Sequence, residues 1–156
     1  MIEALGQQLL KGAVTAGSSD LYILPRGNAY VVYEHGIEGL IPIQSLPQET
    51  GVHLIAHFKY RADMAITENR RPQLGAMTVQ IDGTDINLRL SSVGNFLQQE
   101  SLVVRLLFPL GQQQTHFLVP GQWETLQEWC GLRGLILFAG PTGSGKTTPI
   151  FPLARP

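Results

Sequence analysis

The sequence has little cysteine, little charge and no long apolar run, and each of these absences excludes a class of protein. The single cysteine, Cys130, cannot form a disulfide within the chain, which excludes a disulfide-stabilised secreted domain. Because no partner histidine accompanies Cys130 in the sequence, we interpret it as a buried packing residue. The N-terminus lacks a secretory signal, and no apolar run approaches the roughly 18 residues of a membrane-spanning helix. We therefore expect a cytoplasmic chain with no transmembrane segment.

Charged residues make up only 15% of the chain, against about a quarter in an average domain. Eleven Lys and Arg residues against twelve Asp and Glu residues give a net charge of -1. A protein that binds nucleic acid through a large, sequence-independent face has an excess of positive charge, so we expect no direct nucleic-acid binding. Hydrophobic residues make up 44%, which is enough to build a core and excludes a disordered chain.

Apolar periodicity and turn residues divide the first 110 residues into helices and strands. Helical spacing predicts helices over residues 2–16 and 46–66, with Lys59 and Arg61 of the second helix in solvent. β-Rich composition and turn residues predict a hairpin with strands near 21–23 and 30–33, and three further strands at 76–81, 86–91 and 102–108. The sequence therefore predicts an α+β fold, whose first domain at 1–110 has a mostly antiparallel sheet and flanking helices.

A second unit is predicted after a polar, turn-like segment that contains three consecutive glutamines. We place a linker at 111–120 and the start of a second domain at 121–156. Helical spacing predicts a helix around 123–129 that ends at Gly131, and the apolar run at 135–139 predicts a short buried strand of the parallel kind.

Residues 140–147 read Gly-Pro-Thr-Gly-Ser-Gly-Lys-Thr directly after that strand, which is the pattern and the context of a phosphate-binding loop. Glycines let backbone amides turn inward around phosphates, Lys146 is expected to reach the β- and γ-phosphates, and the hydroxyl of Thr147 is expected to bind Mg²⁺. The implied ligand is ATP or GTP with magnesium; a glycine-rich turn that matches by chance is the alternative. The predicted nucleotide-binding residues are Gly140, Pro141, Thr142, Gly143, Ser144, Gly145, Lys146, Thr147 and Thr148.

Two features limit what this loop is expected to do. Pro149 and Pro152 fall in the first turns of the helix that should follow the loop, so we expect that helix to be short, kinked or absent. The sequence ends at Pro156 without the later strands and the acidic residue that hold magnesium in a complete phosphate-loop domain. We therefore expect a truncated domain with no catalytic residue, in which the strand at 135–139 has no sheet to join.

Several stretches upstream of the loop strengthen a resemblance to one family. Residues 19–25 are similar to a Ser-Asp-Ile-His segment, with Tyr22 in place of the histidine, and residues 63–75 to an Asp-Ile-x-Glu-x-Arg-x-Pro-Gln-x-Gly stretch. Residues 89–91 and 100–107 are similar to the two strands that precede an ATPase domain. With the loop, they resemble the type II secretion and type IV pilus assembly ATPases. Glu-Ser-Leu-Val-Val-Arg at 100–105, and the lack of an acidic residue at Leu74, most resemble the competence-pilus branch, which supports DNA uptake in Gram-positive bacteria.

The resemblance implies an N-terminal α/β domain, the start of a RecA-like ATPase domain that uses ATP and Mg²⁺, and a ring of six chains on the cytoplasmic face of the membrane. The implied partners are sister subunits of this hexameric ring and inner-membrane platform proteins of a pilus or secretion system. Arginines of the family's first domain lie near nucleotide, a role that carries over to Arg89 and Arg105 and, less directly, to Arg70. Guanidinium groups can neutralise charge on a transferring phosphoryl group. The alternative is an ion pair of these arginines with Glu100 or Glu68 on a solvated sheet face.

Two functional hypotheses follow from the sequence. The first is the nucleotide-binding portion of a pilus or secretion ATPase, whose intact form couples ATP hydrolysis to pilus assembly and DNA uptake, with no hydrolysis by these residues alone. The second is a non-catalytic interaction module, in which residues 1–119 fold alone and dock on ATPase subunits or pilus machinery. Binding of ATP that depends on Lys146 separates the first from the second.

Overall fold

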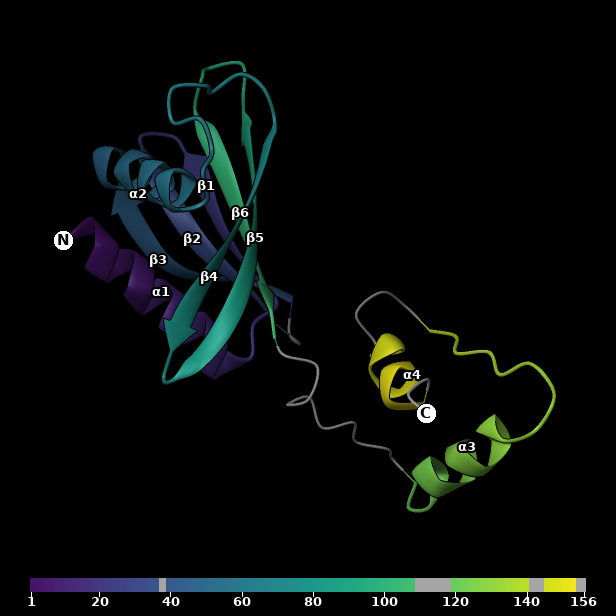
Figure 1. The fold of residues 1–156 in the computed structure, drawn as a ribbon. Helices are drawn as coiled ribbons and strands as arrows, with labels where there is room; N and C mark the ends of the chain where they lie inside the picture. The colour runs from purple at the N-terminus through teal and green to yellow at the C-terminus, as the bar shows by residue number, and fades with distance from the viewer. Residues whose placement is uncertain (37–38, 109–118, 141–144, 154–156) are drawn as a thin grey trace. The chain divides into compact units, whose positions relative to one another are not determined.

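The computed structural model describes residues 1–36, 39–108, 119–140 and 145–153, and Figure 1 draws the chain as a ribbon. The chain divides into two units, Met1–Leu107 and Phe108–Pro156, which we call the N-terminal unit and the C-terminal unit. Most of the linker predicted at 111–120 lies outside the described residues.

Helix α1 spans Ile2–Ala16, as the apolar spacing predicts. It ends at Gly17, whose φ of 66° lies in the left-handed region that glycine adopts without steric penalty. The backbone N–H of Gly17 donates to the carbonyl oxygen of Val14 over 3.1 Å, which satisfies one acceptor of the last turn. The buried side chains Leu9 and Leu10 lie on the apolar face, so packing of that face holds the helix in place.

Six strands form one sheet in the N-terminal unit. Their bounds are β1 Asp20–Arg26, β2 Ala29–Gly36, β3 Gly39–Pro47, β4 Gln73–Ile81, β5 Thr84–Gly94 and β6 Glu100–Leu107. The strand order is β3-β2-β1-β6-β5-β4, and each pairing between neighbours is antiparallel. The predicted α+β fold with a mostly antiparallel sheet and flanking helices is therefore confirmed.

Strand β3 is absent from the sequence-based prediction, and its two prolines, Pro42 and Pro47, are the residues that hide it. The sheet tolerates both because β3 is an edge strand, where only one side of the backbone has a partner strand. The helix predicted over 46–66 is consequently shorter. Helix α2 spans Gln48–Arg61 and follows directly on β3.

Helices α1 and α2 lie on the same face of the sheet, where α2 contacts β1, β2, β3 and β6 (Figure 1). Side chains alternate accordingly: Leu88 and Leu90 of β5 are buried beneath the helices, whereas Asn87 and Arg89 are exposed on the other face. The largest fully buried apolar side chains of this core are Tyr30, Phe58, Leu21, Ile23, Leu54, Ile55, Ile86, Leu88, Leu90, Leu102 and Val32. No described element of the N-terminal unit covers the second face, which we call the open face.

The prediction that Lys59 lies in solvent is wrong. Its side chain is fully buried, and Nζ donates to Oε1 of Glu100 at 2.7 Å. Lys59 is buried because it lies on the buried face of α2, one turn after Ile55 and beside Phe58. A buried ammonium requires a partner of opposite charge, and Glu100 supplies it. Arg61, also predicted in solvent, has a side chain that is 39% exposed.

The described part of the C-terminal unit contains helix α3, Gln122–Cys130, and helix α4, Thr147–Leu153. Helix α3 ends at Gly131, as predicted, and α4 is short with Pro152 inside it, which agrees with the expected effect of the prolines. Cys130 is exposed, so its interpretation as a buried packing residue is wrong. The reason is that α3 has no buried residue and therefore offers Cys130 no core to join.

The strand predicted at 135–139 does not form. Leu135 and Leu137 are 88% and 81% exposed. A strand needs a neighbouring strand to pair with its backbone N–H and C=O groups, and no described residue of the C-terminal unit belongs to a strand. Within the described ranges, no helix has the length and apolar character needed to cross a bilayer.

Candidate functional site

Two of the three candidate arginines lie together on the open face. Arg89 of β5 lies directly opposite Arg105 of β6, and Arg105 lies opposite Asp20 of β1. Both arginine side chains are exposed. Arg70 belongs to a different place, the segment between α2 and β4. Arg89 and Arg105 are therefore a pair on the sheet, and Arg70 lies apart from them on a connecting segment.

Asp20 fixes the position of Arg105. Nε of Arg105 donates to Oδ1 of Asp20 over 2.8 Å, and this hydrogen bond raises the pKa of Arg105. The side chain of Asp20 is only 6% exposed, and its other oxygen accepts a hydrogen bond from the hydroxyl of Ser19 at 2.7 Å. The predicted alternative partner of Arg105, Glu100, is wrong, because Glu100 pairs with Lys59.

Arg89 is the uncompensated charge of the pair, because it has no ion pair or hydrogen bond within the described ranges while Arg105 has Asp20. Like charges directly opposite each other in a sheet repel. A hollow of about 710 Å³ lies over this row, and its lining includes both arginines, Asp20, Tyr22 and Leu74. A positive group without a partner at the wall of a hollow suits an anionic group of a ligand or a partner chain.

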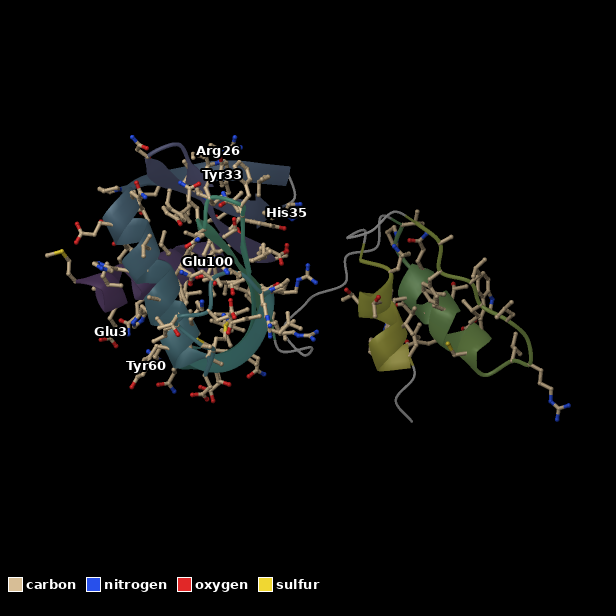
Figure 2. All side chains as sticks on the ribbon, turned by 90° about the horizontal axis from the view of Figure 1, so that it is seen from above. Glu3, Arg26, Tyr33, His35, Tyr60 and Glu100 are labelled. Carbon is tan, nitrogen blue, oxygen red and sulfur yellow. The ribbon has the colours of Figure 1, made fainter. Side chains whose placement is uncertain are left out.

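Arg70 lies on a segment, residues 62–72, whose backbone is held by side chains. The amide of Gln73 donates to the carbonyl oxygens of Ala65 and Glu68 over 3.0 and 2.8 Å. Nζ of Lys59 donates to the same Glu68 carbonyl over 3.0 Å. Figure 2 places Glu100, the charge partner of Lys59, in the interior of the N-terminal unit. The segment is therefore anchored to the core at one buried ion pair.

The carboxylate of Glu68 orders the arginines that follow it. Its Oε1 accepts the backbone N–H of Arg70 over 2.8 Å and that of Arg71 over 3.2 Å. These two bonds lower the pKa of Glu68, because they favour its charged form. The alternative interpretation of Arg70, an ion pair between its guanidinium and Glu68, is wrong: the contact involves the backbone.

We expect the order of this segment to depend on pH. Because the pKa of Glu68 is lowered in the folded state, the stabilisation that its carboxylate gives to this segment is complete above the ordinary Glu pKa of about 4.3. The stabilisation is lost as the pH falls through the lowered pKa. An NMR titration should show the amide signals of Arg70 and Arg71 moving together, with a midpoint below that ordinary value. Glu68→Gln should abolish this common titration. A midpoint at or above the ordinary value would contradict the assigned bonds.

The predicted nucleotide loop is described in part. Pro141, Thr142, Gly143 and Ser144 lie outside the described residues, whereas Gly140 and residues 145–148 are described. Gly145 has a φ of 77°, a conformation that favours glycine, and its carbonyl oxygen accepts the N–H of Thr148 over 3.2 Å. Lys146 is half-buried, and Thr147 is the exposed first residue of α4.

The sequence of the chain matches the family model described as type II/IV secretion system protein over residues 1–153. The chain belongs to this family. It is 37% identical to the competence protein ComGA of Streptococcus pneumoniae over 155 residues, which cover 99% of this chain and 49% of that protein. It is 31% identical to ComGA of Bacillus subtilis, over 99% of this chain and 44% of the relative. The chain thus spans about half the length of these relatives, and the predicted family resemblance is confirmed.

A comparison with solved structures supports the fold described above for this chain. The X-ray structure of the Legionella pneumophila ATPase DotB matches with a TM-score of 0.68 and 16% sequence identity, over 96% of this chain and 41% of that chain. At this identity the likeness concerns the fold alone.

Two residues of the site are missing from the sequence-based prediction, Asp20 and Lys59. Asp20 lies within the stretch that resembles the family, and its alternation with the apolar residues Leu21 and Ile23 places it on the open face. Its contact with Arg105 joins positions 85 residues apart, which only the register of β1 and β6 brings together.

Proposed function

We propose that residues 140–148 bind ATP with Mg²⁺. The sequence Gly-Pro-Thr-Gly-Ser-Gly-Lys-Thr-Thr within a chain of this family is the single observation that carries the proposal. The described donors fit such a ligand: an ammonium at Lys146, an exposed hydroxyl at Thr147 and a left-handed glycine at Gly145. Lys146 would hold the β- and γ-phosphates, and Thr147 would hold magnesium, which neutralises phosphate charge when bound.

The arginines of the N-terminal unit would supply further positive charge to the phosphates. Arg89 and Arg105 share one hollow, and Asp20 orients the second of them, so both are suited to a bound anionic group. Arg70 lies apart from this pair, on the segment between α2 and β4, and is a further candidate for contact with phosphate. Because Arg89 has no partner among the described residues, its replacement should weaken nucleotide binding more than replacement of Arg105.

In the complete protein, this nucleotide site would couple ATP hydrolysis to assembly of a competence pilus and to DNA uptake. The names of the relatives, competence protein ComGA in two bacteria, support this role. Sister subunits of a hexameric ring and platform proteins of the inner membrane would be the partners, on the cytoplasmic side of the membrane. Residues 1–156 contain no later acidic motif after the loop, so by themselves they should bind nucleotide without hydrolysing it.

Replacement of Lys146 by alanine should strongly weaken binding of Mg·ATP. The loss of a charge-assisted contact to phosphate is expected to weaken affinity at least about tenfold, because hydrogen bonds to charged groups contribute about 1.5–3 kcal/mol. Titration of the 156-residue chain with a fluorescent ATP analogue and magnesium measures this change. Lys11→Ala, a change of an exposed lysine in the N-terminal unit, is the matched control and should leave affinity unchanged.

Two outcomes of these measurements would contradict the proposal. Equal affinity of the Lys146→Ala chain and the unchanged chain would contradict the assigned site. Release of phosphate that depends on Lys146 would contradict the expected absence of hydrolysis.

A non-catalytic interaction module is the second candidate, and the open face favours it. The N-terminal unit has its own core, yet one face of its sheet is uncovered, with Leu74 80% exposed there and Phe96 92% exposed on the β5–β6 connection. Exposed apolar groups of this kind are typical of surfaces that bind partner chains. Absent ATP binding, together with retained association with ATPase subunits, would favour this function over the first.

A further inference from the structure

The side chain of Gln73 ties the segment at 62–72, which contains no helix or strand, to the sheet. Its Oε1 accepts the backbone N–H of Ala65 over 2.8 Å. Its Nε2 donates to the carbonyl oxygens of Ala65 and Glu68 over 3.0 and 2.8 Å. The amide therefore uses its oxygen and both of its N–H groups within this one segment. Because Gln73 is the first residue of β4, which pairs with β5, these bonds fix the segment against the sheet.

A series of contacts leads from Gln73 through Glu68 to Arg70. The carbonyl oxygen of Glu68 accepts from Gln73 and from the buried Lys59. The carboxylate of the same residue accepts the backbone N–H of Arg70 over 2.8 Å and that of Arg71 over 3.2 Å. Glu68 is thus held at its own backbone and holds the backbone of both arginines. Loss of the bonds from Gln73 would loosen Glu68 and, through it, Arg70.

The guanidinium group of Arg70, in contrast to its backbone, has no ion pair or hydrogen bond within the described ranges, and the residue is exposed. A backbone that is already fixed reduces the conformational freedom that an arginine loses when it contacts an anion, which favours that contact. Glu68 and Gln73 lie two residues before and three residues after Arg70 in the sequence, so the residues that fix the backbone lie on both sides of the arginine.

We infer that Gln73 is a positioning residue for the nucleotide site: through Glu68, it holds the backbone of Arg70 for contact with the phosphates of ATP. This inference rests on the proposed function, in which residues 140–148 bind the nucleotide. Gln73 acts through Arg70 and makes no contact with ATP itself. Replacement of Gln73 should therefore weaken binding only in a chain that still has Arg70. If Gln73 served stability alone, its replacement would change affinity equally with and without Arg70.

A double-mutant cycle in the full 156-residue chain tests this dependence. Titration with a fluorescent ATP analogue and magnesium measures the affinity of the unchanged chain, Gln73→Met, Arg70→Ala and the double variant. Arg70→Ala should weaken binding about tenfold, because it removes a charge-assisted contact to phosphate. Gln73→Met keeps most of the volume but none of the hydrogen bonds, and it should weaken binding about threefold. The double variant should bind like Arg70→Ala alone.

Glu68→Ala tests the same series of contacts at its second step, and it does so without changing β4. It should also weaken binding about threefold, and only in a chain that has Arg70. The variant removes a negative charge, which by itself would favour a phosphate ligand. A loss of affinity would therefore report the lost order of Arg70.

Gln99→Met is the matched control, because it makes the same change at another glutamine that binds a loop backbone. Nε2 of Gln99 donates to the carbonyl oxygen of Gly27 over 3.3 Å, in the turn between β1 and β2. This variant should leave the affinity for Mg·ATP unchanged, and thermal unfolding confirms that each variant folds. An equal loss of affinity for Gln99→Met and Gln73→Met would overturn the inference.

The remaining outcomes separate the inference from the proposed function. Unchanged affinity of Arg70→Ala, or additive losses in the double variant, would overturn the role of Gln73. Lys146→Ala is measured alongside: if it weakens binding and Gln73→Met does not, the inference alone is wrong. If Lys146→Ala leaves affinity unchanged, the nucleotide site at 140–148 is wrong, and the role of Gln73 falls with it.

Discussion

Replacing Lys59 by methionine is expected to lower the free energy of unfolding of the N-terminal unit by about 3–5 kcal/mol, the usual effect of removing one partner of a buried ion pair. The ammonium is fully buried and 2.7 Å from Oε1 of Glu100, whose side chain is 11% exposed. Methionine keeps most of the volume but leaves the carboxylate without a counter-charge. It also removes the Lys59 donor from the carbonyl oxygen of Ile66 and one of two donors from that of Glu68, which keeps the side-chain amide of Gln73. Urea unfolding followed by circular dichroism measures the change.

Two further variants separate the buried pair from the loss of a lysine in general. Lys59→Met combined with Glu100→Leu removes both charges and should recover most of the stability, because apolar replacement of both partners is often neutral. Lys11→Met removes an exposed pair with Asp82, whose side chains are 60% and 65% exposed, and should cost no more than about 1 kcal/mol. Equal losses for Lys59→Met and Lys11→Met would show that the buried pair has no special role.

Replacing Gly94 by alanine is expected to cost about 3 kcal/mol, the upper end of the usual range for overpacking. The carbonyl oxygen of Asn69 occupies the position that a Cβ at Gly94 would take. Because that atom belongs to the backbone, no rotation of a side chain can relieve the overlap, and the segment at 62–72 must move. Thermal unfolding measures the loss, and NMR should show changed amide signals at Arg70 and Arg71.

Two other glycines provide a graded control. An added Cβ at Gly75 would meet Cγ and Sδ of Met64 at 2.7 Å and Cβ of Ala62 at 2.9 Å. These are side-chain atoms at longer distances than the backbone oxygen at Gly94, so Gly75→Ala should cost less than Gly94→Ala. Gly36 has no described residue within 4 Å of an added Cβ, and Gly36→Ala should change stability by no more than about 0.5 kcal/mol. A Gly94→Ala chain as stable as Gly36→Ala would mean that Asn69 does not hold its assigned place.

Elements whose signals are local could be predicted from the sequence. Helix α1 combines an apolar face with a glycine at its end, and both features lie within its own residues. Strand β5 shows a strict alternation of buried and exposed residues, so its existence and its inner face follow from the order of residues alone. Strand β3 could not be found this way, because prolines are compatible with a strand only when it is at an edge, and edge position depends on the whole sheet.

The partners of the charged residues depend on contacts between distant segments. The family resemblance implied a role near nucleotide for both Arg89 and Arg105, but their position opposite each other follows from the register of β5 and β6. The buried pair of Lys59 and Glu100 did have a local signal on each side. Lys59 occupies the apolar face of its helix, and Glu100 begins an alternation of inward residues, but the prediction that placed Lys59 in solvent did not use these signals.

The order of the strands sets the order in which the N-terminal unit can fold during synthesis. Strands β1 and β6 are neighbours at the centre of the sheet, although they are the first and last strands of the unit along the chain. Until Glu100–Leu107 has left the ribosome, one side of β1 lacks its partner and exposes unpaired backbone groups. Pairing of β6 with β1 joins segments that are far apart in the sequence, so it is a slow step. The growing chain is consequently most exposed to aggregation while β4 and β5 are being synthesised, and protection by a chaperone would be most useful in that interval.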